Sequence, residues 1–97
     1  MGFNERVYEL CKKIPKGKIS TYKEIAKKLN TKAYRAVGNA LNKNKYPNEI
    51  PCYKIINSNG KLGGYALGLK EKIKRLEKDG IEIKDNKIDL KKYLHKF

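Results

Sequence analysis

The segment TYKEIAKKLNTKAYRAVGNALNK, Thr21 to Lys43, contains two short amphipathic patterns separated by a polar turn. Thr21 followed three residues later by Glu24 is the capping-box pattern that begins a helix, and apolar residues recur at helical spacing as far as Leu29. A tight turn at 30–32 precedes the second pattern, whose apolar positions are Ala33, Ala36, Val37, Ala40 and Leu41. The segment predicts two short helices in a helix-turn-helix arrangement, although the spacing alone suits an ordinary helical hairpin equally well.

The other side of the second predicted helix carries small, basic and amide side chains, namely Arg35, Gly38, Asn39 and Asn42. A glycine at the centre of such a face lets a nucleic-acid backbone approach closely, and arginine or asparagine side chains contact phosphates or bases. This face is therefore a candidate DNA-binding surface.

A third amphipathic pattern lies before this segment, at residues 3–14. Asn4 is expected to cap the helix that it predicts, and Pro15 with Gly17 is expected to end it before the extended connector GKIS. Cys11 falls on the apolar side of this helix, so it is predicted to be a small buried hydrophobe.

Three further elements are predicted toward the C-terminus. One more helix is marked by Leu69, Ile73 and Leu76, with Gly80 at its C′ position. The alternating residues 81–84, IEIK, predict a short strand. Asp89 is expected to cap a last turn, whose apolar stripe comprises Leu90, Tyr93, Leu94 and Phe97.

Length and charge limit the classes of function. With 97 residues the chain is expected to form one domain over 1–97, and 24 Lys+Arg against 10 Asp+Glu give a net charge of +14. Such a surface attracts polyanions, which favours nucleic acid as a partner, although a lysine-rich solvated surface is the plainer alternative. Without a secretory-leader pattern or a long apolar run, we expect a cytoplasmic protein, nucleoid-associated if prokaryotic, that makes no membrane contact and is monomeric.

The stretch IPCYKIINSNGKLGGYALGL, Ile50 to Leu69, places Cys52 in a turn-rich region outside any periodic pattern. A thiol in such a position beside Pro51 is retained for chemistry more often than for packing, although a structural role is compatible with the sequence.

Four motifs together are similar to the DNA-binding, active-site domain of the O6-alkylguanine-DNA alkyltransferases, the methylated-DNA-protein cysteine methyltransferases. They are IPKGKISTYKEIA, RAVGNALNKN, IPCYKI and GKLGGYALGL, and the resemblance runs from about Phe3 to Gly80. It implies a mostly α, small winged helix-turn-helix-like domain with minor β structure. The tail DGIEIKDNKIDLKKYLHKF is similar to that of the alkyltransferase-like proteins, which have tryptophan where this sequence keeps Cys52.

The resemblance implies a role for each matching residue. Cys52 would accept the alkyl group as a thiolate, and the Tyr22 phenol would stabilise the leaving guanine near N3. Arg35 would fill the stack vacated by a base flipped through the minor groove. Leu41 would lie at the floor of the flipped-base opening, and Asn44 would brace the active-site turn by hydrogen bonds.

The alkylguanine pocket implied by the resemblance is formed largely by the glycine-rich loop. Tyr65 would form one wall, the backbone at Ala66 would offer an N–H to O6, and carbonyls at Cys52 and Ile55 would receive the exocyclic amine. Gly63, Gly64 and Gly68 would let this loop fold tightly over the base.

Four positions depart from the family pattern. Tyr53 and Lys54 replace the histidine that relays the thiol proton and the arginine that follows it. Asp79 replaces the glutamate at the end of that relay, and Ala66 replaces a serine beside the pocket tyrosine. A neutral phenol, with an ordinary pKa near 10, is a poor base at neutral pH. Any thiolate character of Cys52 must then come from Lys54, backbone N–H groups or the positive field.

The sequence therefore favours a single-turnover enzyme that transfers an alkyl group from O6-alkylguanine in double-stranded DNA to Cys52, with no metal or organic cofactor. The alternative is a non-catalytic alkyltransferase-like module that binds the lesion and passes it to a repair-protein partner. A helix-turn-helix regulator of transcription is a third interpretation, but it leaves PCYKI and GGYALGL unexplained.

Overall fold

The computed structural model describes residues 2–97. Over these residues the chain is mostly helical, with α1 at Phe3–Lys13, α2 at Tyr22–Lys28, α3 at Tyr34–Asn42, α4 at Leu69–Lys78 and α5 at Leu90–Tyr93. A 3-10 turn, η1, spans Cys52–Lys54, and the two strands are β1 at Ser20–Thr21 and β2 at Ile55–Ile56.

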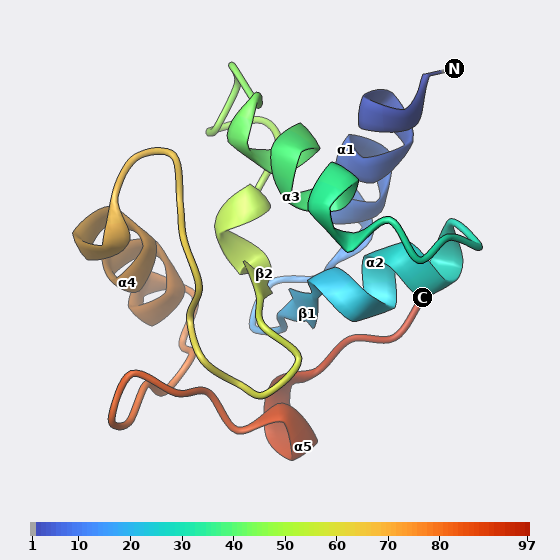
Figure 1. Cartoon of the computed structure of the whole chain (residues 1–97). Helices are drawn as coiled ribbons and strands as arrows, with labels where there is room; N and C mark the ends of the chain where they lie inside the picture. Colours follow the sequence, from blue (N-terminus) through green and yellow to red (C-terminus); the bar gives the residue numbers. More distant parts are fainter. Residues whose placement is uncertain (1) are drawn as a thin grey trace.

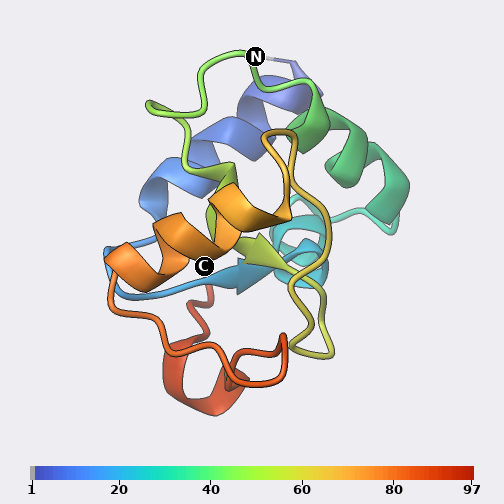
Figure 2. The same ribbon diagram turned by 90° about the vertical axis from the view of Figure 1, so that its left-hand side faces the viewer.

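The two short strands lie at the centre of the molecule, with α4 on one side and α2 on the other (Figure 1). They are parallel, and Ser20 pairs with Ile55 while Thr21 pairs with Ile56. Because successive strand residues face opposite sides, Ile55 packs into one core cluster and Ile56 into another. The first core joins α1, α2, α3 and η1, and the second core lies between the strands, α4 and the C-terminal segment. Figure 2 shows α4 lying across the strands.

The helix-turn-helix predicted at residues 21–43 is confirmed. The Thr21 hydroxyl oxygen accepts a hydrogen bond from the Glu24 N–H at 3.1 Å, which caps α2. Asn30 then adopts a φ of 57°, and the Thr31 N–H donates to the Ala26 carbonyl at 3.0 Å, so the chain leaves α2 in the geometry typical of a helix C-terminus. Short-range hydrogen bonds therefore set the turn that positions α3.

The outward side of α3 is also confirmed, since Arg35, Asn39 and Asn42 are exposed and Gly38 is half-buried. On its inward side the structure buries Val37, Ala40 and Leu41. Ala33 is exposed instead of buried, because it precedes the helix and faces the turn.

The start of α1 differs from the prediction. Asn4 lies inside the helix and is not its N-cap, because the N-cap is Gly2 and α1 begins at Phe3, two residues earlier than predicted. Starting at Phe3 lets that side chain pack against the first core. Cys11 is fully buried in this core, as predicted.

The end of α4 follows the sequence closely. Gly80 occupies the C′ position with a φ of 86°, and the Ile81 N–H donates to the Leu76 carbonyl at 3.0 Å. Leu69, expected on the apolar stripe, is instead 47% exposed, and the fully buried Lys72 takes the inward position.

Residues 81–84, all of them described, do not form the predicted strand. Ile81 is buried and Ile83 half-buried, so the alternation is present, but no neighbouring strand pairs with them among residues 2–97. Lys84 and Lys87 instead exchange two backbone hydrogen bonds of 3.0 Å around Asp85 and Asn86, both of which have positive φ. The alternating pattern therefore predicted which side chains are buried, but it did not predict a partner strand.

The C-terminal segment pairs with the chain just before α2. Asp89 caps α5 as expected, accepting from the Lys91 N–H at 3.0 Å, but the helix ends at Tyr93, before Leu94 and Phe97. The His95 N–H donates to the Ile19 carbonyl at 2.7 Å, and the chain ends beside α2 (Figure 1). Within residues 2–97 no helix has the length and apolar character needed to cross a membrane.

Candidate active site

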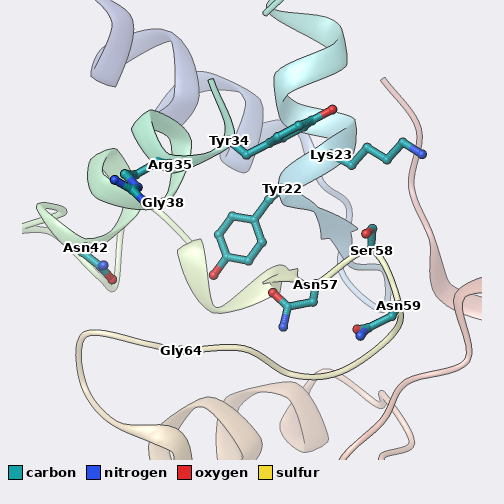
Figure 3. A pocket seen from close by; sticks show the side chains of 10 residues that line it. All are labelled: Tyr22, Lys23, Tyr34, Arg35, Gly38, Asn42, Asn57, Ser58, Asn59 and Gly64. Carbon is teal, nitrogen blue, oxygen red and sulfur yellow. The ribbon is translucent and has the colours of Figure 1, made fainter. Parts of the chain in front are cut away.

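An open cavity of about 620 Å³ lies between the helix-turn-helix and the loop that follows β2 (Figure 3). Tyr22 projects from the start of α2 into the middle of this cavity. The residues that line it are Tyr22, Lys23, Tyr34, Arg35, Gly38, Asn42, Asn57, Ser58, Asn59 and Gly64. We call it the main cavity.

The main cavity brings together several residues singled out from the sequence, among them Tyr22, Arg35 and Gly38. A Cβ built on Gly38 would meet nothing within 4 Å, so space for a close approach is present. Asn39 is exposed beyond the rim, and Leu41 is packed in the first core at 6% exposure. The DNA-binding roles of these residues stay predictions.

Cys52 lies in the first core, with 5% of its surface exposed, and is not among the residues that line the main cavity. Pro51 adopts φ −79° and ψ 63°, and the Cys52 N–H donates to the Ile50 carbonyl at 2.8 Å, which is the geometry of an inverse γ-turn. This tight turn orients the thiol toward the core.

Two tyrosines flank the thiol. Burial raises the pKa of Tyr22 and of Tyr65 above the ordinary value, and the neighbouring Cys52 sulfur contributes to both shifts. Both hydroxyls therefore stay protonated at neutral pH and can donate hydrogen bonds. The Tyr65 hydroxyl is buried and has no hydrogen-bond partner among residues 2–97, so it is available to a ligand.

The brace expected of Asn44 is present in the structure. Its side-chain amide donates to the Ile50 carbonyl at 2.9 Å and to the Cys52 sulfur at 3.2 Å. Its carbonyl oxygen accepts from the Tyr46 N–H at 2.9 Å. One buried amide thus connects both ends of the 44–52 loop and supplies a hydrogen bond to the sulfur.

Asn44→Ala should lower the free energy of unfolding by about 1–3 kcal/mol, because the buried Ile50 carbonyl and the part-buried Tyr46 N–H lose their hydrogen bonds. Urea denaturation followed by circular dichroism measures this change. Asn48→Ala is the matched control, since Asn48 is exposed in the same loop and should change stability by less than about 0.5 kcal/mol. Equal effects of the two substitutions would show that Asn44 does not brace the turn.

Tyr53 and Asp79, which replace the two residues of the family's proton relay, are in direct contact. The Tyr53 hydroxyl donates to the Asp79 carboxylate at 2.6 Å. Burial, with this hydrogen bond as a second cause, raises the pKa of Tyr53 far above its ordinary value. Tyr53 is therefore a fixed donor and does not accept the thiol proton.

Lys54 does not serve the thiol directly. Its buried ammonium donates to the Ile14 carbonyl at 3.1 Å and lies 4.0 Å from an Asp79 oxygen. The charge of Lys54 is thus shared with Asp79 and the end of α1.

Lys72 is the residue that sequence reasoning missed. It is fully buried, and its ammonium donates to the Ile55 carbonyl at 2.7 Å and to the Gly64 carbonyl at 3.0 Å. Burial lowers the pKa of Lys72 to about 8, while the Cys52 sulfur acts in the opposite direction. The sequence contained one sign of this role, since Lys72 lies at helical spacing between Leu69 and Leu76, on the predicted apolar stripe. A charged group at an apolar position needs specific hydrogen-bond partners.

The glycine-rich loop only partly matches its expected form. Gly63 and Gly68 have φ of 70° and 95°, which side-chain-bearing residues rarely adopt, whereas Gly64 has neither a positive φ nor a close neighbour. Ala66 is exposed, and the Ile55 carbonyl already accepts from Lys72, with one lone pair remaining for a base.

Comparison with known proteins identifies the family to which the sequence is similar. Residues 2–81 match the family described as "6-O-methylguanine DNA methyltransferase, DNA binding domain". The chain is 51% identical over 88 residues to a bifunctional methyltransferase/endonuclease of Picrophilus torridus, covering 90% of this chain and 30% of that protein. It is 46% identical over 83 residues to a methylated-DNA–protein-cysteine methyltransferase of Methanosarcina mazei, covering 82% of this chain and 52% of that protein.

A solved structure shares the fold over almost its whole length. S. pombe Atl1, in complex with damaged DNA containing O6-carboxymethylguanine, superposes with a TM-score of 0.87 and 32% identity, covering 98% of this chain and 95% of that one. The chain spans about half or less of the curated relatives above. The chain belongs to the family of the 6-O-methylguanine DNA methyltransferase DNA-binding domain.

Proposed function

We propose that the chain binds double-stranded DNA, takes O6-alkylguanine out of the duplex and transfers the alkyl group to Cys52. The observation that carries this proposal is the Cys52 sulfur, which Asn44 holds in the first core. Tyr22 packs against that core and also lines the main cavity, as does Arg35. A soft sulfur nucleophile suits attack on an sp³ carbon.

The proposed step is a single displacement. The Cys52 thiolate forms a bond to the alkyl carbon, the bond from that carbon to O6 breaks, and its electron pair passes to the guanine. The neutral Tyr22 hydroxyl donates a hydrogen bond to the ring as this charge develops, and guanine gains one proton in place of the alkyl group. The resulting thioether has no route back to a thiol, so each chain reacts once.

The thiol proton needs an acceptor other than Tyr53. Tyr53 is held as a donor to Asp79, so we propose that the proton leaves to solvent when the base enters. The buried Lys72 ammonium, which donates to the carbonyl of Ile55, three residues after Cys52, is the cation proposed to stabilise the thiolate.

One observation favours a second candidate, a module that binds the lesion without reacting. The Tyr53–Asp79 hydrogen bond of 2.6 Å leaves the thiol without the histidine relay of the family pattern. The high overall similarity to S. pombe Atl1 fits this candidate as well. If the wild type binds the lesion without reacting, Tyr53→His tests the cause, because restored transfer would identify the missing relay.

Counting the repaired bases tests the proposed function. Duplex carrying one O6-methylguanine is incubated with limiting protein, and the remaining lesion is quantified by nucleoside chromatography. We expect loss of up to one lesion per chain, followed by no further reaction. Continued turnover beyond one equivalent, or no loss with tight binding, would contradict the enzyme proposal.

Arg35→Ala should weaken binding to lesion-containing duplex by about 10- to 100-fold, because the side chain would no longer fill the vacated stack. Fluorescence anisotropy with matched damaged and undamaged duplexes measures this loss of binding affinity. Lys91→Ala is the control, since Lys91 lies exposed on α5, outside the residues that line the main cavity. If Arg35→Ala weakens binding to both duplexes equally, Arg35 only contacts phosphates.

A further inference from the structure

A second, smaller hollow opens beside the main cavity, at the turn between α2 and α3. It has a volume of about 330 Å³ and is lined by Lys23, Lys27, Asn30, Thr31, Lys32 and Tyr34. We call it the lysine pocket. Nothing in the proposed reaction uses Lys27, Lys32 or Thr31.

The lysine pocket is cationic and lacks a balancing acid. Among residues 2–97, ion pairs form at Lys12, Lys54 and Arg75, so none involves a lysine of this pocket. The acid on α2, Glu24, lines a different hollow, which it shares with Lys27, Lys28 and the chain end. Three ammonium groups around one hollow repel one another unless an anion lies between them.

The lysine pocket adjoins the main cavity, because Lys23 and Tyr34 line both. Figure 3 shows Tyr34 and Lys23 on the α2 side of the main cavity, with Arg35 and Gly38 farther along the same rim. Tyr34 is 49% exposed, so its ring and hydroxyl face solvent at the junction. A strand that delivers a nucleotide into the main cavity can therefore pass over this junction.

We propose that the lysine pocket binds backbone phosphates of the DNA strand that carries the flipped nucleotide. This inference rests on the proposed function. Lys27 and Lys32 would hold the phosphates, and the Tyr34 hydroxyl would donate to them. The Thr31 hydroxyl oxygen accepts from the Ala33 N–H at 3.1 Å, which leaves its own hydrogen to donate to a phosphate.

The wall that the two hollows share limits which DNA phosphates the lysine pocket can contact. Because Lys23 and Tyr34 line both hollows, the contacted phosphates are expected close to the flipped nucleotide and on one side of it. Such an anchor would hold the strand in register while the base leaves the stack. Phosphate contacts fix register and carry no sequence information, so this anchor is expected to serve lesions in any sequence context.

The test combines protein variants with neutral phosphates. Duplexes with one O6-methylguanine receive a single methylphosphonate, which removes one backbone charge, at each of six positions around the lesion. Binding of the wild type, Lys27→Gln, Lys32→Gln and the control Lys91→Gln is measured by anisotropy at several salt concentrations. Each pocket variant should bind the all-phosphate duplex about 3- to 10-fold more weakly and lower the log–log salt slope by about 0.9.

The decisive result is non-additivity at one or two consecutive phosphates. At those positions the methylphosphonate should weaken DNA binding by the wild type and by Lys91→Gln. It should leave binding by Lys27→Gln or Lys32→Gln almost unchanged, because that variant has already lost the contact. If the binding losses caused by the methylphosphonate and by the lysine substitution add at every position, while the wild type still prefers the damaged duplex, this inference is overturned and the proposed function stays intact. A wild type that binds damaged and undamaged duplexes equally would overturn both.

Discussion

Cys52→Ser is expected to abolish methyl transfer, with a fall of at least roughly 1,000-fold, because a hydroxyl is far less acidic and far less nucleophilic than a thiol. Lesion binding should be retained, since serine nearly preserves the volume of the buried side chain and the Asn44 amide can donate to its oxygen. Transfer is measured as loss of O6-methylguanine from duplex, and binding as anisotropy with the same duplex.

Cys11→Ser is the matched control for this substitution, because Cys11 lies in the same first core. Burial raises the pKa of Cys11 to about 12, so only about one chain in 10⁵ carries that thiolate at pH 7. Cys11→Ser should therefore transfer the methyl group normally, provided that the variant is folded by circular dichroism. Transfer that survives in Cys52→Ser but not in Cys11→Ser would reassign the nucleophile.

Lys72→Met should lower the transfer rate by about 10- to 100-fold. Methionine keeps the apolar stem packed, but it removes the buried cation and leaves the Ile55 and Gly64 carbonyls without their donor. Single-turnover kinetics at saturating protein measure the effect. Lys74→Met, at an exposed position of the same helix, should leave the rate unchanged.

The pH dependence distinguishes an electrostatic role of Lys72 from a structural one. Because the pKa of Lys72 is about 8, its charge is present at pH 7 and is lost as the pH rises through 8. The wild-type rate should therefore fall as the pH rises from about 7 to 9.5, and Lys72→Met should lack this fall. A parallel pH profile in both proteins would show that Lys72 acts only by holding the loop.

The sequence predicted best those features that depend on neighbouring residues. The cap at Thr21, the turn at Asn30 and the C′ glycine at Gly80 each involve hydrogen bonds within a few residues, so the local sequence specifies them. Tyr53 and Asp79 were placed together by the family resemblance, since nothing local relates two residues so far apart in the chain.

Features that depend on distant partners were missed. The pairing of the C-terminal segment with Ile19 and the two carbonyl partners of Lys72 both join segments separated along the chain. The strand predicted at 81–84 failed for the same reason, because alternation gives the buried side of a segment without giving its neighbour. In the site, Asn57, Ser58 and Asn59 line the main cavity, and nothing in the sequence indicated that role.

The most direct test of the account is to locate the transferred methyl group. After incubation with duplex containing O6-methylguanine, trypsin releases the two cysteines in separate peptides, 46–54 with Cys52 and 7–12 with Cys11. Tandem mass spectrometry should find one methyl group, on the Cys52 sulfur, and none on the peptide with Cys11. Tight lesion binding with Cys52 unmodified after prolonged incubation would contradict the account and leave the non-reacting, lesion-binding module in its place.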